Sequence, residues 1–377
     1  MDQPDDYRTL GLSPDRIEAW EDGRRSQDIA GSWEWWYFDS ILDDGSQAVI
    51  QFFTKDNPHI SAVEIHPMLR ITITAPDGTK YSSSVKVPAD QARIATDGCD
   101  VSYGPHRFAG DLTDYRIQVA PTEGLSADIH LHSTAKPFRP GTAYFSFSDD
   151  DSLFYTWFCV VPAGEVTGTL TYGGQTHQIH GRGYHDHQWG TIPVIEAWNH
   201  WTWSRQSFDD HAILVFDMTT RKEYGYTRFP LCFVQDADGN VVFENTQGVD
   251  YTVLSEYTDA GSGKVYPKDS RYVFDNDMGR AEYTLHQDDV IESMDIRATV
   301  INQLTPKVGK TLAKWLTPLL LKSASKKMAA KGLDPSYARY NGHAGLTLTP
   351  ADGPVVQRSG KLIYEFMYPG PSYKDAQ

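Results

Sequence analysis

The sequence predicts an all-β protein made of two consecutive antiparallel β-barrel or sandwich domains, with a short helical insertion in the second. Short runs in which apolar and polar residues alternate recur along the 377-residue chain, and such alternation is typical of half-buried strands. Aromatic residues, which favour strands, make up 12% of the sequence. The runs follow one another without helical periodicity between them, which disfavours a parallel sheet with crossover helices.

The first half of the chain contains six runs that we expect to be strands. In one of them Leu69, Ile71 and Ile73 recur at every second position. Gly173-Gly174 separates two others, as a two-residue hairpin turn would. The six runs are Ala48–Phe53, Met68–Thr74, Ala127–Ser133, Leu153–Val161, Val166–Tyr172 and Gln175–His180.

The second half contains seven further runs, several of them separated by Asp-rich turns such as residues 236–239. A glycine-rich segment at 181–190 ends the first group of strands, so we place the domain boundary after it. We expect an N-terminal extension over 1–30, a first β-domain over 31–194 and a second over 195–377. The seven runs are Ala212–Met218, Tyr224–Phe229, Leu231–Val234, Asn240–Phe243, Ala281–His286, Gly345–Thr349 and Lys361–Met367.

Residues 305–332 break the β-pattern and predict a kinked amphipathic helix. This segment contains seven lysines and no acidic residue, and its apolar residues fall at helical spacing. Thr317 followed by Pro318 would suit a helix that restarts at this point. One interpretation is a helix that caps the mouth of a barrel. The other is docking on a membrane surface, which would give access to a lipid-soluble substrate.

Composition excludes several classes of protein. The net charge is −16, whereas a nucleic-acid-binding protein is expected to be basic. The acidic N-terminus lacks the features of a signal peptide, and no apolar run reaches the ~18 residues of a membrane span. We therefore expect a cytoplasmic protein. The fingerprints of P-loop, dinucleotide-binding and GxSxG enzymes do not occur, and we expect no cofactor.

Two dense aromatic runs are the first candidates for a substrate site. Residues 33–39 read Trp-Glu-Trp-Trp-Tyr-Phe-Asp, and residues 198–203 read Trp-Asn-His-Trp-Thr-Trp. In an extended strand, one face of each run would pack in a core, and the other face would need a cavity or partner. Because the second run opens the second domain, we expect both runs to meet near the domain junction and to line one cavity there.

The segment 184–189, Tyr-His-Asp-His-Gln-Trp, carries the candidate acid–base groups. In a strand, His185, His187 and Trp189 would share one face, and Asp186 would lie on the other. A histidine held by a neighbouring carboxylate is an acid–base candidate. The alternatives are a buried structural His–Asp network and a metal site, which no cysteine pair or HExxH motif supports.

These two motifs, Trp33-Glu34-Trp35-Trp36-Tyr37-Phe38-Asp39 and Tyr184-His185-Asp186-His187-Gln188-Trp189-Gly190, resemble the carotenoid 1,2-hydratase (hydroxyneurosporene synthase)/AttH-like family. The wider circle of that family includes kievitone hydratase and lipocalin-like fungal Diels–Alderases. The resemblance covers most of the chain and implies two lipocalin-like β-domains. It implies roles in activity for His187 and Trp189, which match a functional His and Trp of the carotenoid hydratases. The carotenoid hydratases also have a functional Tyr and Asp on the following strand. The nearest match in this sequence is Phe216-Asp217, so the Tyr is absent or displaced here.

The leading functional hypothesis is a cofactor-independent enzyme for a bulky apolar substrate, isoprenoid-like or polyene. An acid would protonate an alkene, and aromatic faces would stabilise the resulting cation until hydration, cyclisation or isomerisation ends the reaction. Asp217 or Asp186 would be the acid, and His187 would position water or take a proton. The alternatives are a pericyclase and a non-catalytic carrier of hydrophobic ligands. The expected substrate-binding residues are Trp35, Trp36, Tyr184, His185, Trp189, His200, Trp201 and Trp203.

Overall fold

The computed structural model describes residues 1–208, 210–260, 262–295, 323 and 326–376. The predicted all-β fold is confirmed, because the strands form two sheets in which all neighbouring strands pair antiparallel. The chain divides into two compact units. Unit 1 comprises Met1–Pro193 and Ala237–Asn240, and unit 2 comprises Val194–Asp236 and Val241–Gln377.

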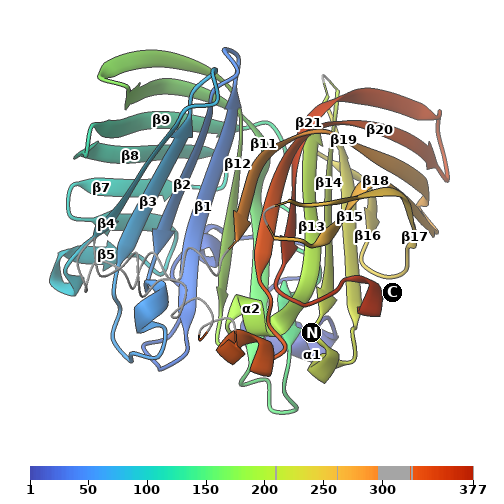
Figure 1. Cartoon of the computed structure of the whole chain (residues 1–377), viewed down its shortest axis with the longest axis horizontal. Coiled ribbons are helices and arrows are strands. Elements are labelled where there is room, and N and C mark those ends of the chain that lie inside the picture. Colours follow the sequence, from blue (N-terminus) through green and yellow to red (C-terminus); the bar gives the residue numbers. More distant parts are fainter. Residues whose placement is uncertain (209, 261, 296–322, 324–325, 377) are drawn as a thin grey trace. The chain divides into compact units, whose positions relative to one another are not determined.

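The sheet of unit 1 curls into a half-barrel. Its strand order is β4-β3-β2-β1-β12-β11-β9-β8-β7-β6-β5, and β10 pairs with β11 at the side. In Figure 1 the strands β1–β3 cross β7–β9 at a steep angle. The strands are β1 (Trp33–Leu42), β2 (Gln47–Phe53), β3 (Met68–Thr74), β4 (Lys80–Lys86), β5 (Ala92–Ile94), β6 (Cys99–Tyr103), β7 (His106–Gly110), β8 (Asp114–Thr122), β9 (Leu125–Ser133), β10 (Tyr144–Ser146), β11 (Phe154–Tyr172) and β12 (Gln175–Gly190).

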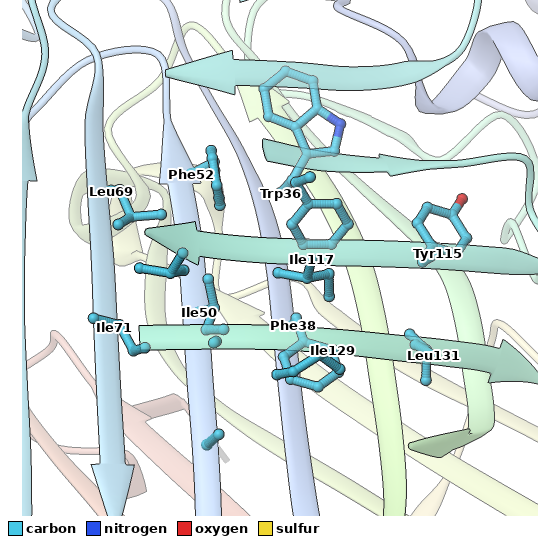
Figure 2. Packing of buried hydrophobic residues seen from close by; sticks show 14 of the residues in the cluster. Trp36, Phe38, Ile50, Phe52, Leu69, Ile71, Tyr115, Ile117, Ile129 and Leu131 are labelled. Atoms are coloured by element: carbon cyan, nitrogen blue, oxygen red, sulfur yellow. The ribbon is translucent and has the colours of Figure 1, made fainter. Parts of the chain in front are cut away.

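The core of unit 1 fills the concave side of this half-barrel. Figure 2 shows Trp36 and Phe38 of β1 among apolar side chains of β2, β3, β8 and β9. Ile117 and Ile129, which lie on the opposite wall, are fully buried, as are Trp36 and Phe38. Because side chains alternate along a strand, each core residue of β1 is followed by one that points to the reverse face of the sheet.

Unit 2 contains a second curled antiparallel sheet, with the order β16-β15-β14-β13-β21-β20-β19-β18-β17. Its core is rich in tyrosine, with Tyr266, Tyr272, Tyr283 and Tyr340 fully buried. The strands are β13 (Trp198–Ser207), β14 (His211–Thr220), β15 (Arg228–Asp236), β16 (Val241–Asn245), β17 (Asp250–Thr258), β18 (Val265–Asn276), β19 (Gly279–Asp295), β20 (Ser336–Pro350) and β21 (Val356–Tyr368).

Helices are short in the part of the chain that the structure describes, and none there is long and apolar enough to cross a membrane. The predicted helical insertion at 305–332 lies mostly outside the described residues. Within this segment, residues 326–330 are described and are helical. The α-helices are α1 (Pro4–Leu10) and α2 (Val194–Ala197), and the 3-10 helices are η1 (Ala19–Asp22), η2 (Asn57–His59), η3 (Ala89–Gln91), η4 (Lys222–Tyr224) and η6 (Lys374–Ala376).

Two strand predictions need correction. The runs Leu153–Val161 and Val166–Tyr172 belong to one strand, β11, which continues through irregular pairing between Cys159 and Gly164. Pro162 does not end the strand because a bulge tolerates a residue that cannot donate to the ladder. The predicted strand over Tyr224–Phe229 is wrong. A 3-10 turn ends there at Gly225 and Tyr226, both with positive φ, and β15 begins only at Arg228.

Candidate functional site

Strand β12 lies between β1 and β11 and places the His-Asp-His motif at the centre of the sheet of unit 1. His187 lies opposite Trp36 of β1, and His185 lies opposite Phe38. Both histidines therefore point toward the core; we call this side the core face. Asp186 lies opposite Tyr37 and points to the other side, which we call the reverse face.

His187 lies on the core face between two carboxylates and two indole rings. Its Nε2 is 2.8 Å from Oε1 of Glu34, and its Nδ1 is 3.3 Å from Oδ1 of Asp22. The ring stacks on Trp36 with centroids 4.6 Å apart, and the ring of Trp189 lies at the same distance on a tilt of 42°. The His187 side chain is fully buried. Such contacts fix the imidazole in one orientation.

His185 makes a second carboxylate contact on the same face. Its Nδ1 is 2.9 Å from the carbonyl oxygen of Tyr37, so Nδ1–H donates there, and its Nε2 is 3.1 Å from Oδ2 of Asp22. The Tyr115 hydroxyl also donates to Asp22, at 2.6 Å. Burial alone would raise the pKa of Asp22. The contact with His185 has the largest opposing effect, followed by His187 and the Tyr115 hydroxyl, and together they lower this pKa.

The N-terminal segment is attached to the core face through these carboxylates. Asp22 belongs to η1, and its carbonyl oxygen accepts a hydrogen bond of 2.9 Å from the Trp36 indole. Glu34 of β1 accepts hydrogen bonds from the backbone N–H groups of Arg25 and Ser26 and from the Ser26 hydroxyl. Each buried carboxylate thus joins a histidine of β12 to residues of the N-terminal segment.

Three side chains of this network could in principle hold a metal ion. Asp22, Cys99 and His185 each place a donor atom within 4.8 Å of the others, and all three are buried. Carboxylate, thiolate and imidazole are ligands that zinc uses. The Asp22 carboxylate is, however, already bonded to His185 and Tyr115, so a hydrogen-bonded network accounts for this cluster without a metal.

Asp186 occupies a different environment on the reverse face, where the hydrogen bonds to its carboxyl come from neutral donors. The hydroxyl of Tyr184 donates at 2.9 Å, the indole of Trp157 at 3.2 Å and the amide of Gln188 at 3.1 Å to each oxygen. Asp186 is only 3% exposed. Burial raises the pKa of Asp186 to about 7, although these hydrogen bonds and the charge of His185 act against it.

Aromatic side chains surround this carboxyl on the reverse face. The ring of Tyr37 meets that of Tyr184 edge-on at 6.2 Å, and the Tyr155 hydroxyl donates to the Gln188 amide oxygen at 2.8 Å. Trp33 and Trp35 stack with centroids 4.5 Å apart. The predicted site residues Trp35, Tyr184 and Asp186 therefore share this face, whereas Trp36, His185, His187 and Trp189 share the core face.

Asp217, the other predicted acid, lies in the middle of β14 in unit 2 and does not end the strand. Its two oxygens accept hydrogen bonds of 2.8 and 2.6 Å from the guanidinium of Arg228. An acid that protonates an alkene must keep its proton near neutral pH, which apolar surroundings favour. A bidentate pair with arginine is a strong charge-assisted contact and suits a structural role for Asp217.

The predicted residues of β13 also divide between two faces. His200 and Asp217 lie on the side of the tyrosine-rich core, and Trp201 and Trp203 lie on the other. The His200 ring is 5.6 Å from that of Phe366 in a stacked arrangement, and burial lowers the pKa of His200 to about 4. That one cavity joins these tryptophans with residues of unit 1 stays a prediction.

Sequence reasoning missed several residues of the site. Asp22 lies in what the sequence presents as a polar extension, and nothing in its pattern marks it as buried. Trp157 lies in an apolar run in which it resembles any core residue. Glu34 could have been found, because strand alternation places it on the same face as Trp36 and opposite Trp189.

Comparison with characterised sequences identifies two relatives that each match about half of the chain. A hydroxyneurosporene dehydrogenase from Chlorobaculum tepidum is 25% identical over 214 residues, which are 47% of this chain and 54% of the relative. The quinolone epoxide rearrangement protein asqO from Emericella nidulans is 22% identical over 207 residues, which are 52% of this chain and 57% of the relative. The chain thus spans only about half the length of these relatives.

Solved structures share the fold over nearly the whole chain. An AttH crystal structure from Nitrosomonas europaea aligns with a TM-score of 0.57 at 17% identity and covers 91% of this chain and 94% of its own. Kievitone hydratase from Nectria haematococca aligns with a TM-score of 0.54 at 15% identity. The alignment covers 96% of this chain and 95% of the hydratase. The sequence profile of the AttH-like family matches residues 27–290, which is more than half of the sequence. The chain therefore belongs to the AttH-like family.

Proposed function

We propose that this protein is a cofactor-independent enzyme that acts on a bulky apolar substrate, isoprenoid-like or polyene, by acid-initiated hydration, cyclisation or isomerisation of an alkene. The observation that carries the proposal is the Asp186 carboxyl. It is buried, it is held by three neutral donors, and burial raises its pKa to about 7. A carboxyl that keeps its proton near neutral pH is what alkene protonation requires.

The chemistry would proceed through a carbocation. Asp186 transfers its proton to the less substituted alkene carbon, which leaves a tertiary cation on the neighbouring carbon and a carboxylate on the enzyme. Water then adds and returns a proton to Asp186, or an adjacent C–H bond loses its proton instead. Indole and phenol faces such as Trp157 and Tyr184 would stabilise the cation, by about 2 kcal/mol each where water is excluded.

His187 and Trp189 take a positioning role in this proposal. They match the functional pair of the carotenoid hydratases, but they lie on the core face, on the side of β12 opposite to Asp186. His187 would act by keeping β12 in register between Glu34 and Asp22, and so by keeping the Asp186 carboxyl in place. This replaces the expectation that His187 itself contacts water at the reacting atoms.

The relatives support an enzymatic role. The two sequence relatives are named for chemistry on hydroxyneurosporene and on a quinolone epoxide, and both compounds are small organic molecules. One of the structural neighbours is a hydratase. These names support the proposal that the protein is an enzyme of small-molecule metabolism.

Solvent deuterium tests the proposal. The probe is lycopene, an acyclic polyene with terminal trisubstituted alkenes, presented in detergent micelles in deuterated water. It would be incubated separately with the wild-type protein, with Asp186→Asn and with Asp128→Asn. Asp128 is an exposed control carboxylate that pairs with Arg116. We expect one carbon-bound deuterium per turnover with the wild-type and Asp128→Asn proteins, and almost no turnover with Asp186→Asn.

Each rival function gives a different result in this experiment. A pericyclase would convert a suitable substrate without incorporating deuterium and would tolerate Asp186→Asn. A carrier would bind the polyene and release it unchanged. Loss of activity in Asp217→Asn together with normal activity in Asp186→Asn would transfer the role of acid to Asp217.

Membrane docking through residues 305–332 stays a separate proposal, based on the seven lysines and the apolar spacing of that segment. Co-sedimentation with anionic liposomes, with and without these residues, tests it. Binding that disappears on deletion and weakens with salt is expected. Equal binding by both proteins would contradict it.

A further inference from the structure

A small pocket lies on the core face of unit 1, beneath the N-terminal segment and away from Asp186. It is open on one side and has a volume of about 120 Å³. Leu10 and Leu12 of the N-terminal segment contribute to one wall, and Tyr144, Phe158 and Trp189 of the sheet contribute to another. The remaining lining residues are Trp20, Glu21, Arg25, Arg139 and Thr142.

The N-terminal segment is anchored over this pocket by contacts with the sheet. The amino group of Met1 donates to the carbonyl oxygen of Tyr144 at 3.0 Å, and the Thr142 hydroxyl donates to the carbonyl oxygen of Met1. Arg139 forms a buried ion pair with Glu21 and also donates to the carbonyl oxygen of Ser13. The pocket is therefore a built feature of the unit, with walls from two parts of the chain.

The size and the walls of the pocket suit one ring or one branched five-carbon group. A buried cavity of about 150 Å³ lined by apolar side chains is large enough to bind benzene, and this pocket is only slightly smaller. Four aromatic rings, those of Trp20, Tyr144, Phe158 and Trp189, line it. Such walls favour an apolar, preferably planar, group.

Arg25 gives the pocket a positive group that makes no direct ion pair, although the nearby charges of Glu34, Glu21 and Asp22 act on it. Its guanidinium carbon is 4.8 Å from the centre of the Trp20 ring, and its Nε and Nη2 donate to the carbonyl oxygens of Gly23 and Thr96. Among the described residues, no carboxylate lies within ion-pair distance of this guanidinium. Arginine has five N–H donors, so further donors remain for an anion. Arg139, in contrast, is paired with Glu21.

We propose that this pocket binds a small apolar monocarboxylate, with the ring or branched end among the aromatic walls and the carboxylate at Arg25. A guanidinium stacked on an indole is well suited to receive a planar carboxylate. The site is distinct from that of the proposed function, because its walls lie on the core face whereas Asp186 lies on the reverse face.

Titration with benzoate and with its neutral counterpart benzyl alcohol tests this proposal, with isothermal calorimetry as the readout. We expect benzoate to bind with a Kd of about 1 mM or lower, which is typical of a ligand of this size. Arg25→Gln should weaken benzoate binding about tenfold to a hundredfold, the loss of one charge-assisted contact, and leave benzyl alcohol binding unchanged. Arg16→Gln removes an exposed arginine of the same segment and should change neither.

A pocket-filling variant locates the bound molecule. Leu12→Trp should abolish binding of both probes, and Leu10→Trp is a second filling variant in case the first does not fold, as judged by its melting temperature. Asp186→Asn should bind benzoate like the wild type, which separates this result from the test of the proposed function. Undiminished benzoate binding in Arg25→Gln or in both filling variants, or no benzoate binding by the wild type, would overturn the proposal.

Discussion

The two faces of β12 place neighbouring residues of one strand in opposite electrostatic environments. On the core face, His185 and His187 each lie within 3.3 Å of a carboxylate oxygen. On the reverse face, the Asp186 carboxyl has only neutral hydrogen-bond donors. Opposite charges stabilise ionised groups, whereas burial without an opposite charge disfavours them. A single strand thus carries histidine–carboxylate contacts on one side and a buried carboxyl with a raised pKa on the other.

The largest effect is expected from Asp186→Asn. If Asp186 is the acid, its removal should lower kcat/KM by about 10²–10⁴-fold, as for other general acids, while the melting temperature stays the same or rises. Turnover of the polyene and thermal unfolding should be measured on the same preparation. A folded variant with near-normal turnover would show that the difference between the two faces has no catalytic meaning.

Stability should depend on pH through the same carboxyl. Its pKa is 3.8 in an ordinary setting and about 7 in the folded protein. Between these values the unfolded chain has released the proton and the folded protein keeps it, so the contribution to the free energy of unfolding falls as pH rises and levels off above about 7. The difference between these two pKa values corresponds to about 4 kcal/mol.

Urea unfolding at pH 4 and pH 8 measures this contribution as the difference between the wild type and Asp186→Asn. The variant should gain stability relative to the wild type at the higher pH. The opposite sign would mean that Asp186 is a carboxylate stabilised by its donors, as in a structural network. Activity should likewise fall about tenfold per pH unit above about 7, because only the protonated form donates.

His187→Ala tests the core face and should cost about 3 kcal/mol of stability. It removes the histidine partner of Glu34 at 2.8 Å and opens a gap between the rings of Trp36 and Trp189. His187→Gln, which retains a hydrogen-bond donor, should recover part of the stability and, with it, part of the turnover. If His187→Ala loses turnover with an unchanged melting temperature, His187 acts on the substrate and the positioning role is wrong.

A smaller loss is expected from Asp217→Asn in unit 2, about 2 kcal/mol. The bidentate pair with Arg228 is lost, but the Arg228 side chain is 31% exposed and can be hydrated in part. Chemical unfolding monitors this change, with the exposed pair Asp128 and Arg116 as a control in which Asp128→Asn should cost less than about 1 kcal/mol. Equal losses at both sites would argue against a buried structural role for Asp217.

The sequence was sufficient for the fold class and for the division of side chains between faces. Alternation along 33–39 and 184–189 correctly separates Trp36 and His187 from Trp35 and Asp186, because the side-chain period of a strand is two. It could not reveal Asp22, since the position of η1 against β12 depends on contacts between residues 163 positions apart. Nor could it choose between Asp186 and Asp217, because the choice depends on which side chains reach each carboxyl in the folded protein: neutral donors such as Tyr184 at Asp186, and the guanidinium of Arg228 at Asp217.

The most direct test of the central claim is a titration of the Asp186 carboxyl itself. Carbon-13 NMR of protein labelled at aspartate carboxyl carbons would assign its signal as the one that disappears in Asp186→Asn. A midpoint near pH 7 is expected from burial among neutral donors. A midpoint near the ordinary aspartate value of about 4 would contradict the account, because Asp186 would then be ionised at neutral pH, as the lowered pKa of Asp22 indicates for that carboxyl on the core face.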